Sequence, residues 1–378
     1  MTKATPVTGW HQSRRLLAAT LGRSSHPRNT PISGGFRAQD FHLHVTPLSH
    51  MCPGYLLKCS SVCGVAVSQP IPHIDYPGTF QEFLDWFPDD DACLDYLAGL
   101  RWPDGFVCPT CGVAEDPWRT KRGLRMCRSC GRKTSVTAGT IFHRTRTPLT
   151  TWFTAMWLVT SQKNGISALG LQRALGFGAY ETAWAWMHKM RRAMVRPDRD
   201  LLSGQVEVDE IFVGGISPGK DGVSTDKTPV MVAAERVGTG GKIGRIRLAV
   251  AQRPNSNELV DFATDVVAPG STIHTDGAIM LRKLADMGYT HEYIVGMRAE
   301  DPDAVMPAVH MTSTLLKRWL TGTLHYAVEP HQLPYYLDEF TFRFNRRTSR
   351  KRGMLWYRLL QQAVDTDPQP LRKLLNPS

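Results

Sequence analysis

The spacing of apolar positions changes along the chain and predicts two kinds of structure. Before residue 200 the apolar residues recur every three or four positions, which is typical of helices. Beyond residue 204 short apolar runs alternate with amphipathic stretches. We expect strands at 205–213, 229–237, 244–251, 271–276 and 291–295, and helices at about 257–267, 279–286, 307–321 and 331–345. Three successive strands followed by alternating helices and strands indicate an α/β fold with a mixed sheet.

Residues 147–200 predict three helices. The first opens at Pro148, Ser167 is placed to cap the second, and the third covers about 181–194. A turn containing glycine at 176–178 separates the second helix from the third. Two short helices joined by such a turn fit a helix-turn-helix that binds DNA, and the same pattern fits a helical hairpin in a core.

Positive charge is concentrated in one part of the chain. The sequence carries 45 Lys+Arg against 34 Asp+Glu, a formal net charge of +11, and no acid occurs from Pro117 to Tyr180. The cations of that stretch are Arg119, Lys121, Arg122, Arg125, Arg128, Arg132, Lys133, Arg144, Arg146, Lys163 and Arg173. Such a block is the electrostatic footprint of a protein that binds nucleic acid, although a solvated basic face without a ligand has the same composition.

Four of the eight cysteines have the spacing of metal ligands. Two residues separate Cys108 from Cys111 and Cys127 from Cys130, and fifteen residues lie between the pairs. This spacing predicts a structural Zn²⁺ site with four thiolates, with disulfides or free thiols as the alternatives. Because the segment around these cysteines has few apolar side chains, it would need the metal in order to fold. We assign 108–146 to a zinc ribbon followed by a basic strand region.

The two ends of the chain differ from its middle. Residues 1–74 are rich in Ser, Pro and Arg and contain one acid, Asp40, so we expect a disordered tail or a translation start placed too far upstream. Residues 75–107 predict a helical lead-in, in which Asp91 caps the second of two short helices. Residues 346–378 begin with a cluster of cations and predict a basic C-terminal tail. No stretch approaches the roughly 20 apolar residues that span a bilayer, so we expect no membrane partner.

Two acids stand where strands can present them to a metal ion. Asp209 lies inside the apolar strand 205–213, and Asp276 ends the strand 271–276. Carboxylates at neighbouring strands suit Mg²⁺, which takes few carboxylates and several exchangeable oxygens, including those of a phosphate. Taken singly, each acid favours the simpler interpretation, in which Asp209 is a surface acid at a strand end and Asp276 forms a turn before Gly277. Beside a first half that binds nucleic acid, the pair favours phosphodiester chemistry.

The helix predicted over 307–321 has a polar face. His310 and Lys317 are seven residues apart, so they share that face two turns apart. A His near a helix start can ligate a metal or move a proton, and a Lys can hold a phosphate. A solvated polar face explains the same spacing, and the residues by themselves favour that interpretation.

The order of these features resembles bacterial insertion-sequence transposases of the DDE superfamily, in the ISXO2-like branch with an N-terminal zinc ribbon. The resemblance covers roughly 77–362. Its most specific part is the sequence Tyr336-Leu337-Asp338-Glu339-Phe340-x-Phe342-Arg343-Phe344-Asn345. It implies a ribonuclease H-like catalytic domain over 204–345 that uses Mg²⁺ or Mn²⁺, preceded by the zinc ribbon and the helix-turn-helix.

The resemblance also implies which residues are catalytic. Asp209 and Asp276 fall on the first and second acids of the superfamily. The third acid stands seven residues before the helix lysine, here Lys317, and that position is His310. Members of the branch vary there among Glu, Asn and His, and a neutral imidazole suits Mg²⁺ less well than an oxygen ligand does. The alternatives for the third acid are Glu300, Asp301 and Asp303.

The function implied is that of a transposase acting on double-stranded DNA. Such a protein binds the inverted-repeat ends of an insertion sequence, cleaves a strand at each end and transfers it to target DNA. Cations such as Arg119, Lys121 and Arg132 would contact phosphates, and the third helix, around 180–189, would contact base edges. The family implies a homo-oligomer that holds two ends together, and a cytoplasmic, nucleoid-associated location. A catalytically inactive DNA-binding regulator and a nuclease that cleaves without joining are the competing interpretations.

Overall fold

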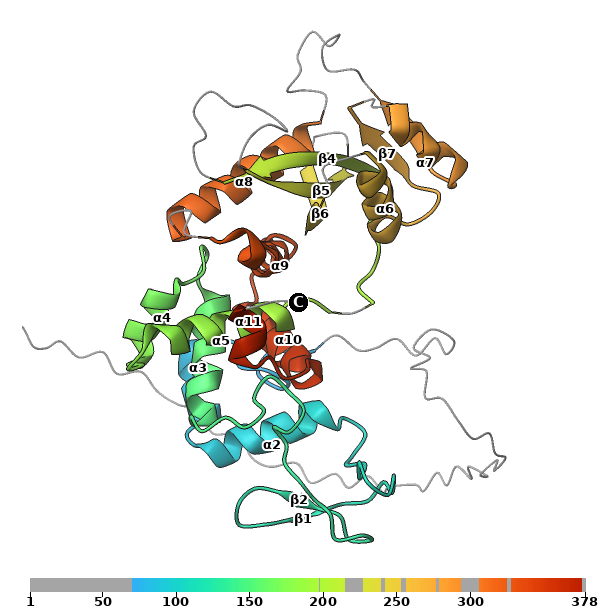
Figure 1. Ribbon diagram of the computed structural model, residues 1–378. Helices are drawn as coiled ribbons and strands as arrows, with labels where there is room; N and C mark the ends of the chain where they lie inside the picture. The colour runs from blue at the N-terminus through green and yellow to red at the C-terminus, as the bar shows by residue number, and fades with distance from the viewer. Residues whose placement is uncertain are drawn as a thin grey trace, which may run out of the picture. The chain divides into compact units, whose positions relative to one another are not determined.

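The computed structural model describes residues 70–196, 198–214, 227–238, 242–252, 256–276, 279–293, 306–324 and 328–375 (Figure 1). Almost all of the segment 1–74, for which we expected a disordered tail or a misplaced start, lies outside these residues. The alternative acids Glu300, Asp301 and Asp303 lie outside them as well.

Helices from distant parts of the sequence share one aromatic core. They are α1 (Phe80–Trp86), α2 (Asp90–Arg101), α3 (Leu149–Ser161) and α10 (Arg352–Asp365). Trp356 of α10 is fully buried at the centre. The rings of Phe83, Phe87 and Phe153 lie 5.5, 5.3 and 5.5 Å from that of Trp356. Aromatic pairs at this spacing stabilise a core beyond the burial of their area.

The C-terminal residues differ from the basic tail that we expected over 346–378. They form α10 and the short helix α11 (Leu371–Leu375) instead. Although this segment begins with cations, α10 has an apolar face at helical spacing. It is made of Leu355, Trp356, Leu359, Leu360 and Ala363, all of them buried. Residues near the C-terminus thus complete a core that begins with helices of the first half of the chain, so removing α10 would expose the aromatic cluster.

One of the two expected helix caps is correct. The predicted cap of α2 is wrong: Asp89, not Asp91, is the N-cap, and its side chain accepts the N–H of Ala92 at 2.9 Å. The predicted cap of α4 (Ala168–Leu175) is confirmed, because Ser167 accepts the N–H of Gly170 at 3.0 Å. The third helix, α5 (Tyr180–Ala193), follows a glycine turn and packs against α4, as the helix-turn-helix pattern predicts.

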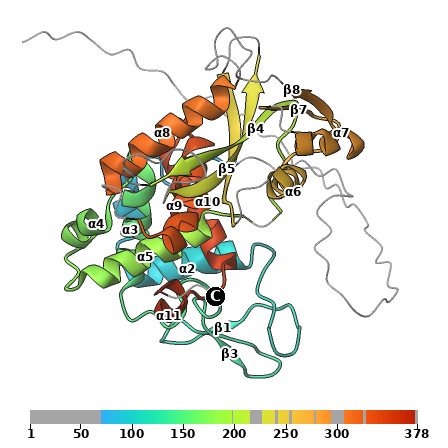
Figure 2. The ribbon, with the colours of Figure 1, turned by 45° about the horizontal axis from the view of Figure 1, so that its top comes forward.

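The second half of the chain contains a mixed five-stranded sheet (Figure 2). Its strands are β4 (Gln205–Val213), β5 (Thr228–Val237), β6 (Lys242–Val250), β7 (Thr272–Thr275) and β8 (Thr290–Tyr293), in the order β6-β5-β4-β7-β8. β4, β5 and β6 are antiparallel neighbours, and β7 and β8 run parallel to β4. The predicted α/β class is confirmed, and this order is that of a ribonuclease H-like sheet.

Helices cover both faces of this sheet (Figure 2). α6 (Ser256–Val266) packs on one face, against Val206 and Val208 among others. α8 (Pro307–Leu324) and α9 (Leu333–Phe344) pack on the other, against Ile211 and Val232. Successive side chains of a strand point to opposite faces, so β4 supplies both cores. Short 3₁₀ turns at Ile279–Arg282 and Pro330–Gln332 precede α7 (Lys283–Asp286) and α9. None of the helices in the described ranges has the length and apolar character needed to cross a bilayer.

The sequence that carries the family resemblance forms α9 and has a structural role. Glu339 is buried and accepts Nε–H groups of Arg191 from α5 at 2.8 Å and of Arg343 at 2.9 Å. Asn345 accepts the N–H of Ile246 at 2.8 Å and donates to its carbonyl at 3.1 Å, which covers the edge of β6. α9 therefore joins the helix-turn-helix to the sheet through paired buried charges and a protected strand edge.

Candidate functional site

Asp209 and Asp276 lie on neighbouring parallel strands. In the register of β4 and β7, Glu207 lies opposite His274. Each aspartate comes two residues after one member of that pair, and side chains two apart point to the same side of a strand. The register therefore brings the two acids to the same level of the sheet, at the point where β7 ends.

The surroundings of Asp209 oppose its ionisation. Burial raises the pKa of Asp209 to about 7, and the negative charge of Asp276 acts in the same direction. A hydrogen bond from the Glu210 N–H at 2.8 Å lowers this pKa but does not cancel the effect. The two acids are thus close enough for their charges to interact. Such a pair resists full ionisation unless a cation is bound, so these residues fit a divalent metal with oxygen ligands.

Two further acids belong to this negative region, and we did not predict them from the sequence. Burial raises the pKa of Glu210, and so do the charges of Asp276 and Glu258. Glu258 lies in the first turn of α6, and its Oε1 accepts the N–H of Gln252 at 2.7 Å. The signal for Glu210 was its position next to Asp209, whereas nothing in the sequence connects Glu258 with β4.

His310 lies in the first turn of α8, where its side chain is exposed. Its charge acts on Glu207 of the sheet, which is fully buried. Burial raises the pKa of Glu207, whereas a hydrogen bond from the Val309 N–H and the charge of His310 lower it. The imidazole is therefore within electrostatic range of Glu207, two residues before Asp209.

The three predicted metal ligands do not form a compact cluster. Within the described ranges, the group of three or more potential ligands with all ligand atoms inside 4.8 Å is the four cysteines. Asp209 and Asp276 are brought together, whereas His310 is placed beside Glu207. Lys317 is half-buried two turns along α8; burial lowers its pKa, and so does the charge of Lys227. Two neighbouring ammonium groups suit an anion such as a phosphate.

The four cysteines form the cluster that their spacing predicts. Sγ of Cys108 lies 3.6 Å from that of Cys130, and Sγ of Cys111 lies 3.6 Å from that of Cys127. Backbone N–H groups lower the pKa of Cys108 to about 6, which favours its thiolate. Four thiols at these distances match the tetrahedral shell of structural Zn²⁺.

The backbone around the cysteines repeats the same turn twice. The N–H of Gly112 donates to the Cys108 carbonyl at 2.9 Å, and that of Gly131 to the Cys127 carbonyl at 3.0 Å. Both glycines have left-handed φ, at 71° and 69°, which glycine adopts without strain. The turns lie beside a small antiparallel sheet of β1 (Trp118–Arg119), β2 (Arg125–Met126) and β3 (Lys133–Thr134).

Both regions match known families. Residues 88–133 match the transposase zinc-ribbon domain. Residues 201–345 match the ISXO2-like transposase domain, and the two matches together cover about half of the chain. The chain belongs to the ISXO2-like transposase family. A relative described as an uncharacterized protein in transposable element ISH50 of Halobacterium salinarum is 27% identical over 290 residues, which are 71% of this chain and 94% of that protein.

In this ISXO2-like transposase chain, α2 neutralises part of the basic stretch. The Arg119 guanidinium lies 2.9 Å from an Asp91 oxygen and 2.6 Å from an Asp95 oxygen, and Arg125 lies 2.8 Å from Asp95. Arg119, which we expected to contact phosphates, thus already has two carboxylate partners. Lys121 and Arg132 are exposed and remain predicted phosphate contacts.

The second helix of the helix-turn-helix, α5, is exposed at its start and buried along most of its middle. Tyr180, Glu181 and Thr182 are exposed, whereas most of the residues from 183 to 190 are buried against the helical core. The expectation that residues as far as 189 contact base edges is therefore too broad. Recognition helices contact bases mainly with their N-terminal residues, so the exposed segment still suits that role.

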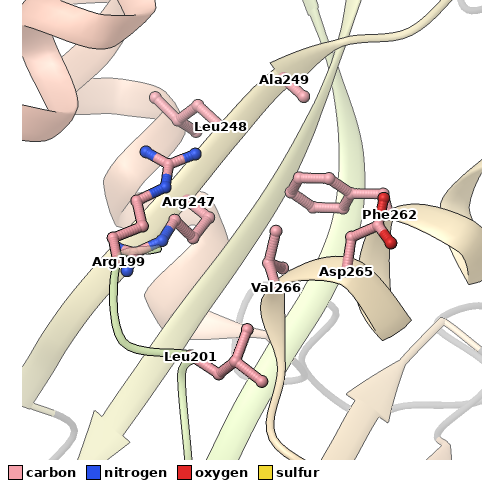
Figure 3. A pocket seen from close by; sticks show the side chains of 8 residues that line it. All are labelled: Arg199, Leu201, Arg247, Leu248, Ala249, Phe262, Asp265 and Val266. Atoms are coloured by element: carbon pink, nitrogen blue, oxygen red, sulfur yellow. The ribbon is translucent and has the colours of Figure 1, made fainter. Parts of the chain in front are cut away.

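A separate cavity of about 280 Å³ lies beside β6 and α6 (Figure 3). Arg199, Arg247, Phe262 and Asp265 are among its lining residues. The Arg247 guanidinium donates to the carbonyls of Ile246 at 3.0 Å and Asp200 at 2.6 Å. None of the predicted catalytic residues lines this cavity, so it is distinct from the region of the two aspartates.

Proposed function

We propose that this protein is a DNA transposase that cleaves and transfers strands at the inverted-repeat ends of an insertion sequence. The observation that carries the proposal is the pairing of Asp209 with Asp276 on neighbouring strands of a ribonuclease H-like sheet. Membership of the ISXO2-like family supports it. The four-cysteine ribbon and the basic helical region supply a DNA-binding half.

The proposed catalytic role of Asp209 and Asp276 is to hold divalent cations, Mg²⁺ or Mn²⁺, against the DNA backbone. Asp209 and Asp276 would hold such a cation, which would supply Lewis-acid polarisation of the scissile phosphate and activation of the attacking oxygen. Their shared negative charge fits this role, because it is unfavourable until a cation neutralises it. Lys317 would bind a phosphate that enters the site, and the charge of Lys227, which acts on Lys317, supports this role.

We propose His310 as the third residue of the site. It stands in the first turn of α8, seven residues before Lys317, and lies within electrostatic range of Glu207 of β4. A neutral imidazole adds no negative charge, so the two aspartates and the nearby Glu210 would supply most of the attraction for the cation.

On the DNA side, we propose that the ribbon and the start of α5 bind the element ends. Zn²⁺ held by the four cysteines would keep the ribbon folded, and exposed cations such as Lys121 and Arg132 would contact phosphates. Residues 180–182 would contact base edges. Joining two ends requires that they are held together, so we propose a homo-oligomer on DNA.

The test is strand cleavage and strand transfer by the purified protein on DNA carrying the ends of the element. Asp209→Ala and Asp276→Ala should each abolish both reactions while binding of the ends is retained. Asp286→Ala, at the exposed end of α7, is the matched control and should stay active. Wild-type transfer by either aspartate variant would refute the site, and cleavage without joined products would indicate a nuclease.

The role of His310 is tested in the same assay. His310→Glu restores the acid that the superfamily carries there and should keep activity, whereas His310→Ala should lose it. Full activity of the Ala variant would show that His310 belongs to a solvated polar face.

A further inference from the structure

Glu207 connects the strand that carries Asp209 with the helix that carries His310. It stands two residues before Asp209 on β4, so its side chain points to the face that α8 covers. Its Oε2 accepts the N–H of Val309 at 2.9 Å, and the N–H of Ala308 is also directed at the carboxylate. One buried side chain thus links two elements that are 102 residues apart in the sequence.

The start of α8 needs such a partner. Pro307 is the first helical residue and has no N–H, so Ala308 and Val309 carry the first free donors of the helix. A carboxylate at this end satisfies those donors and interacts favourably with the helix dipole. The His310 N–H already donates to the Met306 carbonyl at 3.1 Å. The turn that carries His310 is therefore held by its own helix and by Glu207.

Burying the Glu207 carboxylate costs desolvation free energy. The side chain has no exposed surface, and its other oxygen, Oε1, lies 3.5 Å from Nε of Arg236. A buried carboxylate requires desolvation, and an apolar residue in its place would often be as stable or more so. A role in placing α8 gives a reason for a charged residue there.

We propose that Glu207 is a positioning residue that fixes the first turn of α8, and with it His310, to the strand that carries Asp209. It binds no metal and no DNA itself, and acts by fixing the first turn of α8 to β4. The inference rests on the proposed function of Asp209, Asp276 and His310. Partners of this kind typically change metal affinity by about 10–100-fold when they are lost.

The chain offers a matched control in Glu235. It is also a buried strand carboxylate of the same sheet, and it accepts the N–H groups of Ser203 at 3.0 Å and Arg245 at 2.8 Å. Its bonds do not involve α8. Glu207→Gln and Glu235→Gln each remove one negative charge from a buried site, and only the first loosens the start of α8.

The experiment uses the full-length, zinc-loaded protein and Mn²⁺ as the probe. Titration calorimetry gives the Mn²⁺ affinity, and hydrogen exchange of the peptide 306–312 reports the start of α8. Glu207→Gln should weaken Mn²⁺ binding about tenfold or more and speed exchange in that peptide, with the KM for element-end DNA unchanged. Glu235→Gln should leave both readouts at the wild-type value.

Wild-type Mn²⁺ affinity in Glu207→Gln would overturn the inference, and so would an equal loss in Glu235→Gln. If Glu207→Gln does not fold, Glu207→Asp keeps the charge and shortens the side chain by one methylene group. This second variant should show the same two changes, and wild-type values would overturn the inference. Asp209→Asn separates the two proposals: if it binds Mn²⁺ normally the proposed site is wrong, whereas if it loses Mn²⁺ while Glu207→Gln does not, only the positioning role is wrong.

Discussion

Replacing Asp209 by Asn should stabilise the metal-free protein at neutral pH. The substitution keeps the size of the side chain and removes its charge. In the wild-type protein burial and the charge of Asp276 raise the pKa of Asp209 from 3.8 to about 7. The folded state therefore retains a proton that the unfolded chain releases above pH 4.

The sign and size follow from this difference in proton binding. Below pH 3.8 both states are protonated at this position and Asp209 has no cost. As the pH rises towards 7 the unfolded state loses its proton first, so the wild-type protein becomes less stable. A pKa rise of about three units, at roughly 1.4 kcal/mol each, gives a cost of about 4 kcal/mol above pH 7. Asp209→Asn should recover most of it at pH 8 and little at pH 4.

The assay is unfolding in urea. Hydrogen exchange of the peptides of β4 and β5 monitors it, so that the measured stability is that of this sheet. A resin removes divalent metals from the buffers before the protein is added, so that the zinc of the ribbon is not stripped. Added Mn²⁺ should stabilise the wild-type protein and not the variant. A variant less stable than wild type at pH 8, or a difference that does not change with pH, would refute the reasoning.

Three further predictions concern the other parts of the chain. Cys111→Ser should lower bound zinc, measured by atomic absorption, and remove exchange protection from β1 to β3; retention of one zinc per chain would contradict the ribbon. Glu339→Gln should destabilise the protein by about 3–5 kcal/mol in urea, because it leaves the buried Arg191 and the half-buried Arg343 without a full charge partner; a loss under about 1 kcal/mol would mean that these ion pairs do not hold α9 in place. Lys121→Ala should reduce the slope of log affinity for DNA against log salt concentration by about one phosphate contact. Arg119→Ala should reduce this slope less, because Arg119 is paired with Asp91 and Asp95. Equal slopes for the two variants would show that these ion pairs break when DNA binds.

Much of the fold followed from patterns that lie within one element. β4 has the predicted bounds, 205–213, because Val206, Val208, Ile211 and Val213 give this segment the composition of a strand. The cap of α4 and the spacing of the cysteines were also readable, since each depends on residues close in sequence. α10 was missed because the cations at 346–352 suggested a solvated tail, although Trp356 and its neighbours repeat at helical spacing.

Less of the site could be predicted from the sequence, because its contacts join residues that are far apart in the chain. Asp209 and Asp276 were singled out by their places in predicted strands and assigned as catalytic by the family resemblance, and the parallel register of β4 and β7 explains why they meet. No local pattern shows that Glu207 binds the start of α8, since its partner is 102 residues away. The sequence around Glu339 identified the family, but its role as a joint appears only when α5, α9 and β6 are packed together.

Mn²⁺ binding by the zinc-loaded protein tests the central claim most directly. Titration calorimetry on wild type, Asp209→Asn, Asp276→Asn and the double variant forms a double-mutant cycle, with Asp286→Asn as control. If one ion is held by both aspartates, each single variant should lose binding and the double variant should be no worse than either. Independent, additive losses, or wild-type affinity in either single variant, would contradict a shared metal site.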